Sequence, residues 1–229
     1  MKTKSDFNWL TLITGVFITA LIVANIIAVK PINVFGRVVP AAVVVFPISY
    51  IFGDVLTEVY GYAQARRVIW LGFGCNLLAV LAIWAGQVLP GAPYWQGQDA
   101  YSAILGFAPR LLAASFAAYL VGEFANSFVL ARLKVTTNGR WLWLRTVTST
   151  LVGEGLDSAI FMTAAFAGTG VFPPDALLGV IVTQWLFKVT YEILATPLTY
   201  AVVRFLKRQE GMDVFDRNTN FNPLAMGEQ

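Results

Sequence analysis

The chain has 229 residues, of which 57% are hydrophobic and only 13% are charged, whereas a soluble domain carries about 25% charged residues. This composition excludes an ordinary soluble domain and predicts an all-α integral membrane protein, and the length suits one helix bundle. Because there is no histidine and only one cysteine, Cys75, an intramolecular disulfide is excluded, and we expect no metal and no cofactor.

Apolar stretches of about 20 residues predict transmembrane helices, and the chain contains six. In chain order they are Phe7–Val29, Val38–Glu58, Val68–Leu89, Ala108–Leu130, Leu144–Gly168 and Ala176–Val203. We expect Pro47 to interrupt the second span, which ends near Gly61. The connection Gly91–Gly106 is rich in turn formers and aromatic residues, so we place it at the membrane interface. The prediction is a six-helix transmembrane domain over residues 1–209 and a C-terminal tail over residues 210–229.

Basic residues predict the orientation. Twelve of the 16 Lys and Arg residues fall on one side of the six-span arrangement, before the first span, after the second and sixth, and around the connection between the fourth and fifth. Cytoplasmic loops carry such an excess. We therefore expect both termini to face the cytoplasm.

Polar side chains interrupt four of the spans at helical spacing. The sets are Tyr50, Asp54 and Glu58; Glu123 and Asn126; Glu154 and Asp157; and Gln184, Lys188 and Glu192. Residues three or four apart are stacked neighbours, so each set lies on one helix face. A helical rise of about 1.5 Å per residue places Glu123, Glu154 and Lys188 near the middle of the bilayer and Glu58 close to its cytoplasmic boundary. Asn25 lies in the outer half of the first span.

Each group taken singly has a structural explanation as good as a functional one. Lys188 could pair with Glu192 or Glu154 and hold helices together. Asp54 and Glu58 could form a polar helix end that meets the arginines after the second span.

Taken together, the charges favour a binding site. Lys188 is the single central cation, yet four carboxyl groups share its layer: Glu123, Glu154, Asp157 and Glu192. Ionisable groups are costly in a bilayer unless they face a cavity or a partner. Some of these carboxyls must therefore be protonated, hydrated or available to a ligand's donors, which predicts a polar cavity with spare acceptors.

Aromatic residues accompany the same faces: Phe46, Tyr50, Phe161, Trp185 and Tyr191. Most aromatic side chains in membrane helices serve packing alone. Beside carboxyl groups, however, they could stack on a planar ring while the acids accept its N–H groups. A purine-like solute needs that combination.

Several strings carry a family resemblance: SYIFGDVLTEVYGYAQARR (Ser49–Arg67), VGEGLDSAIF (Val152–Phe161), KVTYEILATPLTY (Lys188–Tyr200) and the ending DRNTNFNPL (Asp216–Leu224). They resemble the queuosine precursor transporters, also called the vitamin uptake transporter family, over essentially the whole chain. The resemblance implies a six-helix fold similar to the substrate-binding subunits of energy-coupling-factor transporters, in a bacterial inner membrane. It also implies import of 7-cyano-7-deazaguanine and 7-aminomethyl-7-deazaguanine for tRNA queuosine synthesis or salvage, without an obligatory ATPase partner.

The expected site follows from both arguments. We expect the substrate to bind among Glu154, Asp157, Gln184, Lys188, Glu192, Asn25, Glu123, Asn126, Tyr50, Phe161, Trp185 and Tyr191, and Phe46, Asp54 and Glu58 to line its path or a gate. Pro47 and Pro197 could permit bending during changes of access, or could be static kinks.

Other functions stay open at this point. The chain could be a substrate-capture subunit for a purine-like or vitamin solute that needs a separate ATP-driven module, since it has no GxxxxGK[ST] P-loop of its own. An intramembrane enzyme is disfavoured, because Phe52-Gly53-Asp54 only partly matches the Gly-x-Gly-Asp pattern of aspartyl proteases and no histidine exists for a serine–histidine dyad.

Energy coupling and assembly also stay open. Import could be coupled to a proton gradient through Glu123 or Glu154, or could be facilitated diffusion. The small-residue stretch Leu112–Ala118 could pack helices within one chain or in a homodimer. We expect no nucleic-acid partner.

Overall fold

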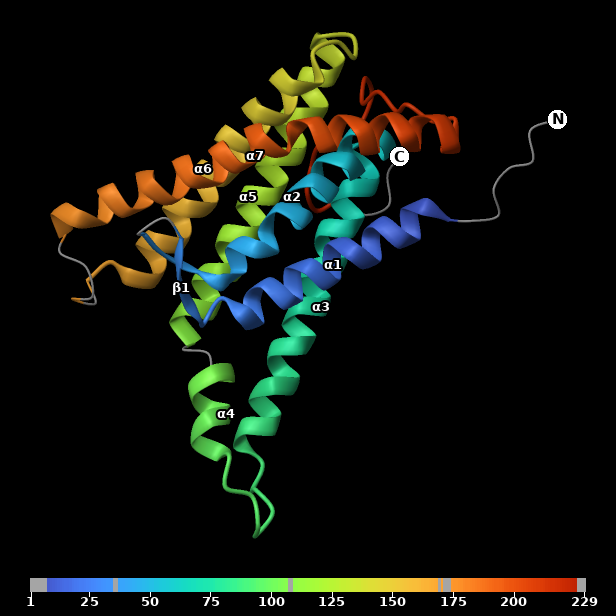
Figure 1. The fold of residues 1–229 in the computed structure, drawn as a ribbon. Coiled ribbons are helices and arrows are strands. Elements are labelled where there is room, and N and C mark those ends of the chain that lie inside the picture. Colours follow the sequence, from blue (N-terminus) through green and yellow to red (C-terminus); the bar gives the residue numbers. More distant parts are fainter. Residues whose placement is uncertain (1–7, 35–36, 107–108, 169, 171–173, 226–229) are drawn as a thin grey trace.

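The computed structural model describes residues 8–34, 37–106, 109–168, 170 and 174–225, and nearly all of its regular structure is helical (Figure 1). The α-helices are α1 (Trp9–Ile27), α2 (Phe46–Val55), α3 (Tyr62–Val88), α4 (Gln98–Leu105), α5 (Pro109–Thr136), α6 (Leu142–Phe166) and α7 (Pro174–Glu210). The remaining elements are a hairpin of β1 (Pro31–Val34) and β2 (Arg37–Pro40), the 3₁₀ turn η1 (Ala41–Val44) and the π-helical turn η2 (Leu56–Tyr60).

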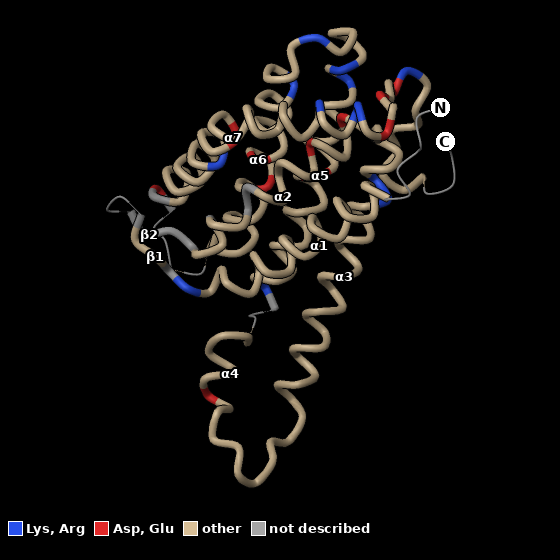
Figure 2. The backbone as a smooth tube through the Cα atoms, turned by 45° about the vertical axis from the view of Figure 1, so that its right-hand side comes forward, with Lys and Arg blue, Asp and Glu red and all other residues tan. Residues whose placement is uncertain are grey.

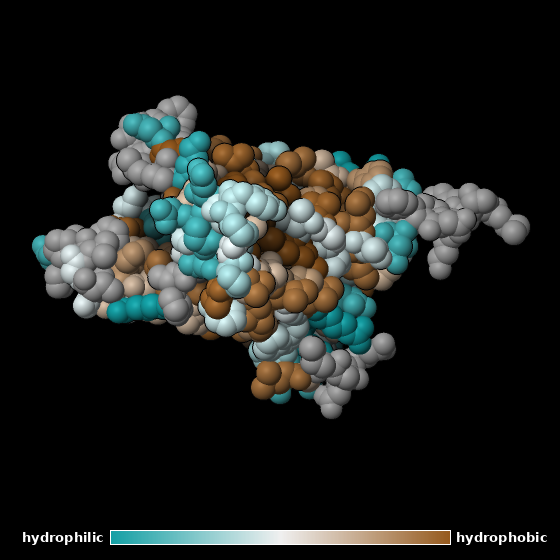
Figure 3. All heavy atoms as spheres, turned by 90° about the horizontal axis from the view of Figure 1, so that it is seen from below, coloured by the Kyte–Doolittle hydropathy of each residue, from teal (hydrophilic) through white to brown (hydrophobic). Residues whose placement is uncertain are grey.

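Four stretches are long and apolar enough to cross a membrane: Trp9–Ile27, Tyr62–Val88, Gln98–Thr136, of which residues 98–106 and 109–136 are described, and Leu177–Glu210. Large apolar side chains on them are exposed, among them Leu78, Trp84, Leu194 and Leu198, as expected for surfaces that face lipid. On the face seen from below, apolar residues lie next to residues of intermediate hydropathy at the middle (Figure 3). The all-α membrane fold is thereby confirmed, while the count of six spans stays a prediction, because α2 is short and α6 carries charges.

The second predicted span is not one helix. Val38–Pro40 lies in β2, whose Pro40 pairs with Pro31 of β1, and the helix begins only at Phe46. Pro47 lies in the first turn of α2, where its missing N–H removes no helical hydrogen bond. The prediction that Pro47 interrupts a helix was therefore wrong, since it helps to begin one.

Helix α2 continues into η2, which ends at Gly61 with φ +81°. Glycine adopts this left-handed conformation without steric cost, so the chain turns there and α3 starts at once. Arg66 and Arg67, expected to follow the second span in a loop, consequently lie inside the first turns of α3.

Two glycines bring α5 and α6 into close contact. A Cβ atom on Gly122 would lie 2.9 Å from Cβ of Asp157, and one on Gly153 would lie 2.7 Å from Cβ of Asn126. Small residues at a helix interface let the backbones approach. Asp157 of α6 therefore lies against Gly122 of α5, and Asn126 of α5 lies against Gly153 of α6.

Basic residues gather at one end of the molecule. Figure 2 shows Lys and Arg concentrated around the connection between α5 and α6 and the end of α7, and we call this the basic end. Residues 211–225, which follow α7 and form no helix or strand, also lie there, and we call them the tail strap. The second half of α3 and α4 extend away from the bundle in the opposite direction (Figure 1).

Candidate substrate-binding site

Four helices contribute polar side chains to one partly buried layer, which we call the central polar cluster. Its members are Tyr50 and Asp54 of α2, Glu123 and Asn126 of α5, Glu154 and Asp157 of α6, and Lys188 and Glu192 of α7. The cluster has two halves, distinguished by whether a cation is present.

Lys188 organises the first half. Its Nζ lies 2.5 Å from Oδ2 of Asp157 and 2.7 Å from Oε2 of Glu154. The same ammonium group lies 5.9 Å from the centre of the Tyr50 ring, within the range of a cation–π interaction. One lysine thereby joins α7 to α6 and α2.

The second half contains Asp54, Glu123 and Glu192, none of which forms a direct ion pair with a described lysine or arginine. The amide of Asn126 donates a hydrogen bond of 2.8 Å to Oδ1 of Asp54. Oε2 of Glu123 lies against Gly53, 3.4 Å from where a Cβ atom would be. Glu192, only 1% exposed, lies close enough to Asp54 to interact with it electrostatically.

Three buried acceptor oxygens in this half have no hydrogen-bond donor among the described residues. They are Oδ2 of Asp54, Oδ1 of Asn126 and Oε1 of Glu192. A buried acceptor without a donor costs about 1–3 kcal/mol. No group of acidic or cysteine side chains in the described chain is arranged to hold a metal ion. The arrangement therefore suits a ligand that presents several N–H donors.

The other residues expected at the site lie in different surroundings. Trp185 donates its indole N–H to the Leu151 carbonyl at 2.9 Å and lies against Gly155. Phe161 packs edge-on against Phe166. Tyr191 is more than one-third exposed. Gln184 is half-buried, one turn before Lys188.

Asn25 makes its described hydrogen bond outside the central polar cluster. Its amide donates to Oδ1 of Asn76 at 3.1 Å and joins α1 to α3. Asn76 is 4% exposed and was not predicted from the sequence, because the pattern of the third span does not show that this residue faces α1. The side chain of Phe46, expected to line the path, lies outside the described residues.

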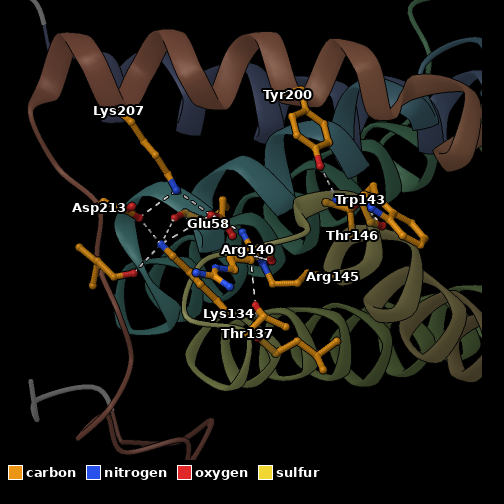
Figure 4. A network of polar contacts seen from close by, with 12 residues as sticks. Glu58, Lys134, Thr137, Arg140, Trp143, Arg145, Thr146, Tyr200, Lys207 and Asp213 are labelled. Atoms are coloured by element: carbon orange, nitrogen blue, oxygen red, sulfur yellow. Dashed lines mark hydrogen bonds and ion pairs between the residues drawn. The ribbon is translucent and has the colours of Figure 1, made fainter.

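Glu58 belongs to a second ionic cluster at the basic end (Figure 4). Its Oε1 accepts from Arg145 and Lys207, each at 2.7 Å, and Lys134 lies 3.7 Å away. Lys134 and Arg145 are almost completely buried. From the sequence, both residues belong to the basic connection between the fourth and fifth spans. Their positions at span ends do not show that their side chains are buried inside the bundle.

A helical bundle with exposed apolar surfaces and a charged layer shared by four helices indicates a multi-pass membrane protein with a polar site among its helices. A family model described as "Putative vitamin uptake transporter" matches residues 40–202. The chain therefore belongs to the vitamin uptake transporter family, as the resemblance predicts, and transport rather than catalysis is confirmed at the level of the family.

Curated relatives are similar over most of their length. The chain is 29% identical to the "Probable queuosine precursor transporter" of Bacillus subtilis (strain 168) over 192 residues, which are 83% of each chain. It is 28% identical to the "Queuosine precursor transporter" of Escherichia coli (strain K12) over 196 residues, 85% of each chain. No solved structure gives a significant match.

Proposed function

We propose that this protein imports 7-deazaguanine precursors of queuosine, 7-cyano-7-deazaguanine and 7-aminomethyl-7-deazaguanine, across a bacterial inner membrane. The names of the relatives from Bacillus subtilis and Escherichia coli support this substrate class. The observation that carries the proposal is the central polar cluster, which combines buried carboxyl oxygens without donors in one half with one lysine in the other.

The donors and acceptors of such a ring suit this cluster. A deazaguanine presents N1–H and the 2-amino group side by side, and a carboxylate accepts two such donors at once. Asp54 and Glu192 offer the acceptors. Lys188 supplies the positive charge of the cluster, and Tyr50, next to it, offers an aromatic face. Glu154 and Asp157 hold Lys188 in place.

We further propose that the basic end faces the cytoplasm. The positive-inside rule supports this orientation, and Figure 2 shows that the basic residues at this end come from elements far apart in the sequence. The substrate then reaches the central polar cluster from the opposite end and leaves past Glu58, one turn beyond Asp54.

The test is uptake by the purified chain alone. We expect liposomes that contain it to take up radiolabelled 7-cyano-7-deazaguanine saturably, and Glu154→Gln to lower uptake at least about tenfold, as expected where a charge-assisted hydrogen bond of about 1.5–3 kcal/mol is lost. Asp175→Asn, at an exposed carboxyl near the start of α7, is the matched control. Measurements with and without an imposed proton gradient distinguish coupled import from facilitated diffusion.

Two other outcomes decide against the proposal. Binding of the base without uptake would make the chain a substrate-capture subunit that needs an ATP-driven module. Failure to bind either deazaguanine, with a folded protein, would exclude this substrate class.

A further inference from the structure

One carboxyl group ties three helices together at the basic end. Glu58 lies in η2 and is 1% exposed. Its Oε1 accepts hydrogen bonds from Arg145 of α6 and Lys207 of α7. Lys134 of α5 forms a longer ion pair with the same oxygen, at 3.7 Å. Figure 4 shows these side chains converging on Glu58 from separate elements. The ends of α5, α6 and α7 are therefore drawn together around η2.

The tail strap binds to the same lysines. Asp213 lies 2.6 Å from Lys134 and 2.9 Å from Lys207, so both lysines bridge it to Glu58. Nζ of Lys134 also donates to the backbone carbonyls of Glu58 and Val214, at 2.5 and 2.6 Å. Partial burial alone would raise the pKa of Asp213. The hydrogen bonds from Lys134 and Lys207 have the larger effect, so the pKa of Asp213 lies below its usual range. Ion pairs of Asp213 with Lys134 and Lys207 therefore hold the first residues of the tail strap against the bundle.

The rest of the strap is fastened to α3. Asp216 accepts the backbone N–H of Tyr62 at 3.1 Å, a favourable place for a carboxylate because it is the start of a helix. Arg66 donates to the carbonyls of Asn220 and Asn222, each at 2.8 Å. The strap therefore runs across the basic end instead of hanging free in solution.

The same short segment joins this closure to the central polar cluster. Asp54, near the end of α2, and Glu58, in η2, lie four residues apart. Between them the chain changes from an α-helix to a π-helical turn, a feature frequent at functional sites. Thr57 of this turn bonds to Ser127 of α5 at 3.1 Å. A displacement of η2 would therefore move both Asp54 and Glu58.

We propose that Glu58, its cationic partners and the tail strap form the inner gate of this transporter. The gate is closed in this structure, and release of the transported solute requires the ion pairs between η2, α7 and the strap to separate. This inference depends on transport but not on the identity of the solute.

Accessibility of a buried position just inside the gate tests the inference. Ser127 is 1% exposed and lies two helical turns before Lys134. The reporter is Ser127→Cys in a Cys75→Ser background, so that the chain has one cysteine. We expect this cysteine to react with a membrane-impermeant thiol reagent only when the gate opens. Labelling is measured in inside-out vesicles without any substrate. Asp213→Asn and Lys207→Gln are the test variants, and Arg208→Gln, at an exposed neighbour of Lys207, is the matched control.

We expect labelling to accelerate about fivefold in each test variant, because each variant removes two ion pairs of a partly exposed residue, and to stay at the parental rate in Arg208→Gln. Asp213→Glu keeps the charge and returns the rate toward the parental value. Asp213 and Lys207 are 45% and 22% exposed, so these variants are better tolerated than a change of Glu58, and melting temperature and gel filtration establish that each is folded.

Unchanged labelling in either folded test variant, or equal acceleration in Arg208→Gln, would overturn the gate. Because the assay uses no solute, its failure leaves the proposed import of deazaguanines untouched, and a failure of uptake leaves the gate assay intact.

Discussion

We assign Lys188 both a structural role and a substrate-binding role. The free energy of its ion pairs with Glu154 and Asp157 allows the structural role to be tested separately from binding. Its side chain is 17% exposed and those of Glu154 and Asp157 are 12% and 26% exposed. Exposed ion pairs contribute about 0–1 kcal/mol, whereas removing one member of a fully buried pair costs about 3–5 kcal/mol. The intermediate burial here leads us to expect about 2 kcal/mol.

We predict that Lys188→Gln destabilises the protein by about 2 kcal/mol and abolishes substrate binding. The double variant Lys188→Gln/Asp157→Asn also removes the Asp157 carboxylate, which has lost its lysine partner. We therefore expect it to recover part of the stability but not the substrate binding. Thermal unfolding in detergent and equilibrium binding of the labelled base measure the two effects. Lys30→Gln, at an exposed lysine, is the control. Normal binding by the double variant would reduce Lys188 to a purely structural role.

At the scale of elements, the contact between α5 and α6 determines how the acids meet. We predict that Gly153→Ala destabilises the protein by about 1–3 kcal/mol, because the new methyl group lies 2.7 Å from Cβ of Asn126 and 2.9 Å from the Gly122 carbonyl. Gly179→Ala in α7 has no atom within 4 Å, and the helix propensity of alanine makes it neutral or slightly stabilising. Equal thermal midpoints for the two variants would contradict the close packing of α5 and α6.

The helices themselves are largely predictable from sequence, but not all their boundaries are. The apolar run Leu144–Gly168 predicts α6 to within two residues at each end, since hydropathy reports a long helix directly. The region around α2 is different. The strand β2, a 3₁₀ turn, α2 and a π-helical turn share one apolar run there, and hydropathy does not distinguish these backbone conformations.

At the scale of the whole molecule, helical spacing predicts which polar residues share a face but not which helices are neighbours. The spacing of Glu154 and Asp157 places both carboxyls where one lysine of α7 contacts them. The partners of Glu58 come from α5, α6 and α7, and the tail strap adds Asp213. Such long-range contacts arise from tertiary packing, and a polar tail after the last span gives no sign in its composition that it folds back.

The tail strap also predicts how stability responds to acid. Hydrogen bonds from Lys134 and Lys207 hold the pKa of Asp213 below its usual range, despite partial burial that acts in the opposite direction. A carboxyl group whose pKa is lower in the folded protein contributes stability that is fully present above its unfolded pKa of about 3.9 and is lost as pH falls through the folded value. Asp213→Asn should therefore melt below the parent at neutral pH, and the difference should shrink below about pH 4.

Thermal midpoints of the two proteins across this range measure the effect, with Asp175→Asn as the control at an exposed carboxyl. Because Asp213 is 45% exposed, added salt should also diminish the difference at neutral pH. A difference that grows on acidification would mean that the protonated carboxyl is the stabilising form. The strap would then be held at its start by something other than the charges of Lys134 and Lys207.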